Sequence, residues 1–190
     1  EWVDPISVNY HGYDVWELPP NGHGITVLMA LQILKDMDLG ARDDVETLHK
    51  QIEAMKLAMT DTANYVAEPS YMKVTVEELL SEEYASRRRA EISDVAKLPT
   101  VGDPKYHSTV YFCAADKDGN MVSMIQSNFR GFGSGIVIPG TAISLNDRAE
   151  NFKFDENHAN ALLGGKRPYH TIIPGFLTKD GVAVGPFGIM

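Results

Sequence analysis

The chain has 190 residues, 44% of them hydrophobic, and a net charge of -9 from 26 acidic and 17 basic side chains. This length and composition are enough for one substantial hydrophobic core, whereas the acidic balance argues against nucleic-acid binding. No apolar run approaches membrane-spanning length. The single cysteine, Cys113, excludes an intrachain disulfide, so the cellular compartment, cytoplasmic or secreted, stays open. Because the chain opens on Glu-Trp and closes on GPFGIM, we expect it to be a piece of a longer protein.

The first half of the sequence predicts a short hairpin and then helices. Residues 10–18 are typical of a strand or hairpin, and the Pro- and Gly-rich residues 19–24 form a loop. Helices are expected over 25–39 and 44–66. The second carries an apolar stripe that we expect to face the core, made of Val45, Leu48, Ile52, Met55, Met59 and Val66.

A capping-box pattern opens a further expected helix. Thr75 is followed three residues later by Glu78, and the helical pattern continues to about Ile92. The residues from 97 to 107 contain two prolines and a glycine, and they predict a polar linker.

Two apolar runs, Val110–Ala115 and Met121–Ile125, flank the sequence DKDGN and predict a β-hairpin. Both runs are almost wholly apolar, which favours strands covered on both faces and an inert, buried Cys113. Counting outward from an Asp116–Asn120 pair places Thr109 opposite Ser127. Two hydroxyls that face each other at the end of such a hairpin are a candidate site, although the hairpin alone favours a plain cross-strand pair.

Other motifs point to no cofactor. The glycine-rich stretch 131–135 lacks the Lys-Ser/Thr of a phosphate loop, and it lacks the dinucleotide-binding spacing as well. The six histidines show no metal-ligand spacing. We therefore expect neither a cofactor nor a metal.

Several segments together resemble the γ-glutamyltransferase family of N-terminal-nucleophile hydrolases. They are HGYDVWELPPNGHGI, the helix with Glu53, Ala54 and Asp61, Thr109 followed by DKDGN, and then GFGSGIV, LND and GKRPYHTIIP. The resemblance covers nearly the whole chain. It implies an α/β (α+β) fold, a four-layer α/β/β/α sandwich that this chain contains in part.

The resemblance also implies self-cleavage at the Ser108–Thr109 bond. Residues 1–108 would then be the mostly helical end of a large subunit, and 109–190 the mostly β start of a small subunit, within one composite domain. A threonine hydroxyl needs a nearby base, and the freed α-amine of Thr109, with an ordinary pKa of about 7.7–8.0, suits that role. The family places a threonine at the Ser127 position, hydrogen-bonded to the nucleophile.

The resemblance further implies contacts with substrate, and here the sequence departs from the family pattern. The family asparagine two residues after the Ser127 position is Phe129, with Asn128 alongside, and its Gln and Asp are Arg148 and Asn151. The family serine pair becomes His170-Thr171. Arg148 favours a carboxylate over an ammonium as its partner, although a ligand-free surface loop is a close alternative for Arg148 and Asn151.

Three functions remain open on this basis. The first is hydrolysis or transfer of the γ-glutamyl group of glutathione-type amides, to water or an acceptor amine, through a threonine acyl-enzyme. The second is a glutaryl- or cephalosporin-acylase-like amide hydrolase, whose donor lacks the α-amino group. The third is an unprocessed, non-catalytic paralogue. The family's oxyanion Gly-Gly pair would follow Met190, so the other large- and small-subunit segments are expected partners, and we expect these 190 residues alone to be inactive.

Overall fold

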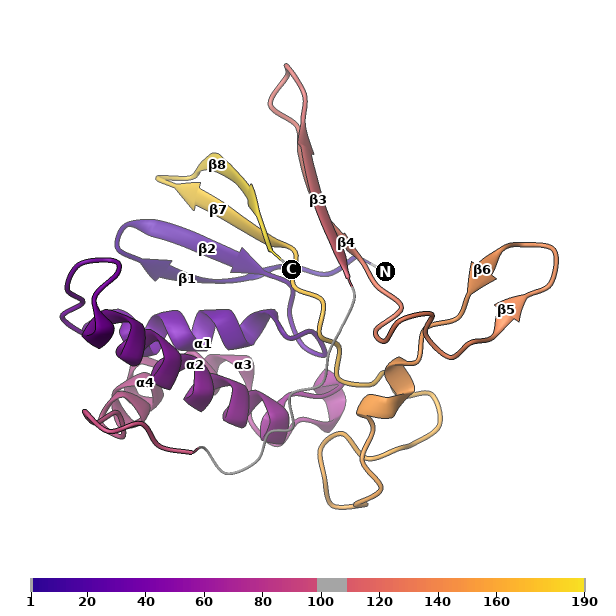
Figure 1. Cartoon of the computed structure of the whole chain (residues 1–190), viewed down its shortest axis with the longest axis horizontal. Coiled ribbons are helices and arrows are strands. Elements are labelled where there is room, and N and C mark those ends of the chain that lie inside the picture. Colours follow the sequence, from indigo (N-terminus) through magenta and orange to yellow (C-terminus); the bar gives the residue numbers. More distant parts are fainter. Residues whose placement is uncertain (1, 99–108, 190) are drawn as a thin grey trace.

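A four-stranded antiparallel sheet with helices on one side forms the body of the protein (Figure 1). The computed structural model describes residues 2–98 and 109–189. The strands of the sheet lie in the order β1 (Ile6–Tyr10), β2 (Tyr13–Glu17), β7 (Gly175–Lys179) and β8 (Val182–Phe187). Both ends of the sequence thus contribute to one sheet.

Two tight turns join the strand pairs of this sheet. His11 and Gly12, both with positive φ, connect β1 to β2. The hairpin therefore begins at Ile6, earlier than the strand or hairpin expected over residues 10–18. Asp180 and Gly181, also with positive φ, connect β7 to β8. In both turns glycine takes the left-handed conformation that other residues adopt only at a cost.

The helices pack on one face of this sheet. They are α1 (Gly24–Leu34), α2 (Val45–Tyr65), α3 (Val76–Leu79) and α4 (Glu82–Arg89). Helix α1 contacts β1, β2, α2 and α4, and it therefore lies at the centre of the core. Its residues Ile25, Leu28, Met29 and Ile33 are at most 2% exposed.

The predicted apolar stripe of the second helix does not face this core. Val45 and Ile52 are 82% and 57% exposed, while Ala54, Ala58 and Thr62 are fully buried. The reason is steric: small side chains four residues apart let α1 approach closely, and the larger apolar side chains point away. Only Val66, at the end of the stripe, is buried as expected.

The expected helix from Thr75 to Ile92 is divided in two. Its capping box is confirmed, because Thr75 Oγ1 accepts from the Glu78 amide and Glu78 Oε2 accepts from the Thr75 amide. Ser81, however, is extended and caps α4 through its own side chain, which accepts from the Tyr84 amide. Competition from this hydroxyl for backbone donors ends α3 and restarts the helix.

The second half of the chain forms two further hairpins. One joins β3 (Val110–Ala115) to β4 (Met121–Gln126), and the other joins β5 (Val137–Ile138) to β6 (Ile143–Ser144). The β3–β4 hairpin projects beyond β8 (Figure 1). No helix within residues 2–98 and 109–189 is long and apolar enough to cross a membrane.

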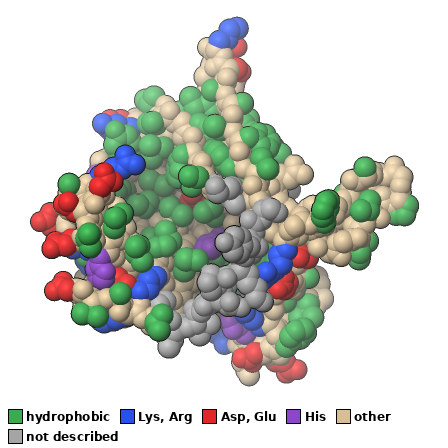
Figure 2. All heavy atoms as spheres, viewed as in Figure 1, with side chains coloured by type: hydrophobic (Ala, Val, Ile, Leu, Met, Phe, Trp, Pro, Cys, Tyr) green, Lys and Arg blue, Asp and Glu red, His purple; other side chains and the backbone are tan. Residues whose placement is uncertain are grey.

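One face of the β3–β4 hairpin is exposed, contrary to the expectation of two covered faces. Val110, Phe112, Val122 and Met124 are between 44% and 62% exposed. Cys113 is also exposed, so it is not the core residue that the apolar run predicted. Figure 2 shows apolar side chains gathered over the sheet and hairpin on this face of the molecule.

Candidate active site

Thr109 and Ser127 meet at the end of the β3–β4 hairpin, as the register count predicted. The strands pair Val110 with Gln126, and the Thr109 hydroxyl donates to Ser127 Oγ at 2.9 Å. At the far end, Asp116 Oδ1 accepts from the amides of Asp118 and Asn120, each at 2.9 Å. These bonds close the turn and fix the register that brings the two hydroxyls together.

Ser127 also holds the start of the next segment. Its Oγ accepts from the Phe129 amide at 2.9 Å. Phe129 has a positive φ of 76°, which is uncommon for an aromatic residue, and its ring is 4% exposed. The chain therefore turns sharply after Ser127 and buries Phe129 behind the hydroxyl pair.

A buried guanidinium lies over the Phe129 ring. Arg148 belongs to the 3₁₀ helix η2 (Arg148–Asn151), is 4% exposed, and has its Cζ 5.2 Å from the centroid of the ring. Its Nη1 donates to Thr171 Oγ1 at 3.0 Å. No carboxylate among the described residues forms an ion pair with it, and burial lowers its pKa. The charge of Asp147 opposes this lowering from beyond ion-pair distance. A buried cation without a close ion pair is costly, which makes Arg148 a candidate for binding an anion.

Two backbone contacts attach this 3₁₀ helix to the end of β4. The Asp147 amide donates to the Asn128 carbonyl at 3.2 Å, and the Arg130 amide donates to Asp147 Oδ1 at 3.1 Å. Arg148 is thereby held beside the segment that follows β4, although the intervening residues include the β5–β6 hairpin. Asn128 contributes its carbonyl to this attachment.

His170 lies on the other side of Thr171. Its amide donates to the Asn21 carbonyl at 2.9 Å, which ties this segment to the loop before α1. Burial, and then the positive charge of Arg148, lower the pKa of His170 to about 4. The ring is therefore neutral at neutral pH and does not compete with Arg148 for an anion.

Asn151 has a structural role in these contacts. Its Nδ2 donates to the Tyr169 carbonyl at 2.9 Å, and its carbonyl accepts from Asn160 Nδ2 at 2.7 Å. The predicted residues thus divide into two groups. The structure joins Thr109, Ser127, Phe129, Arg148 and Thr171 through a chain of contacts, while the Asn151 amide is occupied by backbone. Ser108, the other side of the expected cleavage bond, lies outside the described residues.

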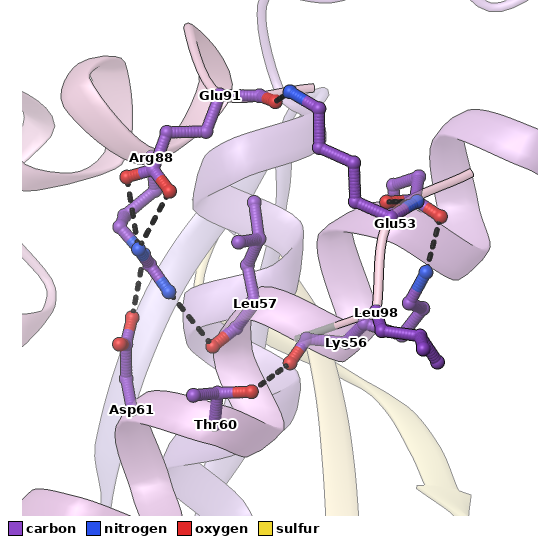
Figure 3. Close-up of a pocket in the computed structure, with 9 residues that line it drawn as sticks. Glu53, Lys56, Leu57, Thr60, Asp61, Arg88, Glu91 and Leu98 are labelled. Carbon is purple, nitrogen blue, oxygen red and sulfur yellow. Dashed lines mark hydrogen bonds and ion pairs between the residues drawn. The ribbon is translucent and has the colours of Figure 1, made fainter. Parts of the chain in front are cut away.

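A cavity of about 340 Å³ lies between α2 and α4 (Figure 3). Unlike Arg148, the charged side chains that these two helices contribute to it form ion pairs with one another. Arg88 bridges Asp61, at 2.9 Å, and Glu91, at 2.8 Å, while Lys56 pairs with Glu53. Each of these charges has a partner, so the cluster links the helices and leaves no group free for a ligand. Among the residues that the structure describes, no group of three or more His, Cys, Asp or Glu side chains could hold a metal.

Glu17 is a further candidate residue, which no sequence pattern had singled out. It is only 2% exposed at the end of β2, and its Oε2 has no hydrogen-bond partner among the described residues. Its position could have pointed to its burial. Side chains alternate along a strand, so Glu17 lies on the same inward face as Val15.

Comparison with known proteins identifies the family. The model of the gamma-glutamyltranspeptidase family matches residues 1–190. The chain belongs to this family.

Two curated relatives show the range of named activities in the family. The glutathione hydrolase-like YwrD proenzyme of Bacillus subtilis (strain 168) is 37% identical over 183 residues, covering 95% of this chain and 35% of the relative. The oxamate amidohydrolase proenzyme of Klebsiella pneumoniae is 31% identical over 186 residues, covering 98% and 35%. The chain thus spans about a third of the length of these relatives.

Solved structures confirm the expected fold. The crystal structure of cephalosporin acylase from Bacillus halodurans matches with a TM-score of 0.93 and 59% identity, over 100% of this chain and 35% of that one. This gamma-glutamyltranspeptidase-family chain is therefore part of an N-terminal-nucleophile hydrolase fold. Its family comprises glutathione hydrolases and acylases.

Proposed function

We propose that Thr109 is the nucleophile of an amide hydrolase or acyltransferase, made active by cleavage of the Ser108–Thr109 bond. Residues 1–108 would end the large subunit and 109–190 would begin the small one. The observation that carries this proposal is the 2.9 Å hydrogen bond from the Thr109 hydroxyl to Ser127 Oγ, at the head of a hairpin with a fixed register. The proenzyme names of the relatives are consistent with such processing.

The reaction follows from the chemistry of an N-terminal threonine. The freed α-amine takes the hydroxyl proton as Oγ1 attacks the amide carbonyl, and it returns that proton to the leaving nitrogen as the C–N bond breaks. This gives an acyl ester on Thr109. Water or an acceptor amine then attacks the ester carbonyl, and the threonine hydroxyl is restored.

The acyl group that fits the site carries a carboxylate, in γ-glutamyl or glutaryl form. Support for this comes from Arg148, which is buried near the hydroxyl pair without a carboxylate partner among the described residues. A γ-glutamyl group also carries an α-ammonium, which an acidic side chain would satisfy, and neither Arg148 nor Asn151 can do so. We therefore propose a glutaryl-type amide as the preferred donor, and the glutathione-type amide as the second candidate.

The test compares three anilides in the full-length protein: glutaryl, γ-glutamyl and the uncharged butyryl. We expect the highest kcat/KM for the glutaryl anilide. Arg148→Met should lower this kcat/KM about 10- to 100-fold, the range for a lost charged hydrogen bond, and should leave the butyryl anilide little changed. Arg130→Met is the matched control, because Arg130 also lies over Phe129 but is paired with Glu150. Equal losses on all three anilides would contradict the role of Arg148.

A further inference from the structure

A second cavity, of about 320 Å³, opens beside the hairpin that carries Thr109. Its wall comes from the end of β2, from α1, from the root of the β3–β4 hairpin and from the segments around β7 and β8, which converge in Figure 1. The main wall residues are Glu17, Val27, Tyr111, Ile125, Ile173 and Phe187. Most of this wall is apolar, and Glu17 is the one carboxylic acid among the described residues that line it.

The Glu17 carboxyl is buried without an ion-pair partner, and one of its oxygens lacks a hydrogen bond. No cation among the described residues pairs with it, its Oε2 lacks a hydrogen-bond partner, and burial raises its pKa to about 7. Two glycines leave room for it. A Cβ at Gly24 would lie 2.9 Å from Oε2, and one at Gly175 would lie 2.9 Å from Oε1. The backbone is fitted around the carboxyl group of a residue in the cavity wall, which is the arrangement of a ligand site.

The position of this cavity relative to Thr109 is set by the hairpin register. Tyr111 pairs with Ile125, one residue further along each strand than the Val110–Gln126 pair. Because side chains alternate between faces, Tyr111 and Ile125 lie on the same face as Thr109 and Ser127. The cavity wall therefore begins about 7 Å along the strand from the hydroxyl pair.

The hydroxyl pair has two chemically different neighbours. Ile125, two residues before Ser127 on the same face, lines the cavity. Phe129, whose amide donates to Ser127 Oγ, lies beneath Arg148. An amide substrate has an acyl end and an amine end, and each end needs a place of its own beside the hydroxyl pair.

We propose that the Glu17 cavity binds the amine portion of the amide, and that it favours amines with an apolar body and a cationic group for Glu17. This inference rests on the proposed function, since it assigns the second half of the same substrate. It makes Glu17 a specificity-determining residue, because a buried carboxylate discriminates strongly between a ligand that donates hydrogen bonds to it and one that does not.

The test uses two glutaryl anilides with the full-length protein, one with a para aminomethyl group and the other with a para ethyl group of similar size. We expect the wild type to favour the aminomethyl anilide about 10- to 100-fold in kcat/KM, the range for a charged hydrogen bond. In Glu17→Gln this ratio should fall to near one. The ratio is the readout, since general damage to folding or self-cleavage changes both rates alike.

A second variant covers the case in which Glu17→Gln fails to fold. Val27→Phe fills the cavity from the α1 side, and it should raise KM for both anilides relative to glutaramate, the primary amide without an amine body. A wild-type ratio near one, the same ratio in wild type and Glu17→Gln, or an equal effect of Val27→Phe on all three amides would overturn the proposal. If the wild type cleaves none of these amides, then the proposed function itself fails.

Discussion

The Thr109 hydroxyl depends on its neighbours, and Ser127 is the one that the structure shows in contact with it. Ser127 Oγ accepts from both the Thr109 hydroxyl and the Phe129 amide. It therefore orients the Thr109 hydroxyl and fixes the turn that follows Ser127. The sequence predicted this pair from hairpin counting alone, since the Asp-Gly turn and two apolar runs leave little freedom in register.

Replacing Ser127 by alanine removes the acceptor of the hydrogen bond from the Thr109 hydroxyl. We expect Ser127→Ala to lower kcat of the full-length enzyme about tenfold, the equivalent of one hydrogen bond. Ser127→Thr restores the hydroxyl and should recover most of the rate. Steady-state kinetics on the glutaryl anilide provide the measurement. If the alanine and threonine variants are equally impaired, then the hydroxyl is not what matters.

Glu17 gives a pH dependence of stability with a definite sign. Its pKa rises from the ordinary 4.5 to about 7 on burial. Between these values the folded state holds a proton that the unfolded state has released. The free energy of unfolding should therefore fall as pH rises through this window, by up to about 3 kcal/mol.

The glutamine in Glu17→Gln has no titratable proton, so the free energy of unfolding of this variant should not fall with pH in this window. Denaturant unfolding of the full-length protein at pH 5 and pH 8, in wild type and variant, measures the difference. Glu83→Gln, at an exposed position on α4, is the control and should behave as the wild type. The same loss of stability in wild type and Glu17→Gln would refute the assignment of this proton to Glu17.

At the scale of elements, the helices could be located from sequence but their orientation could not. The start of α2 at Val45 and the capping box of α3 follow from local patterns. The buried face of α2 does not, because the periodicity of large apolar residues points to one face whereas the small residues Ala54 and Ala58 pack on α1. The partner helix decides which face of α2 is buried. The residues of α2 alone therefore do not predict this face.

Because Ala58 is fully buried where α2 packs on α1, we expect a larger side chain at this position to destabilise the fold. The Ala58→Leu substitution adds bulk where α2 meets the core and should lower the free energy of unfolding by about 1–3 kcal/mol. Ala63→Leu makes the same change at an exposed position of the same helix and should have little effect. Thermal or denaturant unfolding compares the two. Equal effects would show that Ala58 is not tightly packed in solution.

At the scale of the whole molecule, the fold is partial. The chain covers 35% of the cephalosporin acylase structure that it matches. Apolar side chains on α2 and on the outer face of β3–β4 are exposed in the described residues. The apolar character of both hairpin runs predicted cover on two faces. The described residues cover one face only in part, since Cys113 on that face is exposed, and they leave the other face exposed. The family fold was predictable because its motifs run through nearly the whole sequence, whereas the Glu17 cavity was not, because residues distant in sequence form its wall.

The central claim is that Thr109 becomes an N-terminal nucleophile. The most direct test is the intact mass of the purified full-length protein beside a Thr109→Ala variant. We predict two subunits in the wild type, with a new N-terminus at Thr109, and one uncut chain in the variant. A single uncut chain in both would contradict the claim and would favour a non-catalytic protein that keeps the fold.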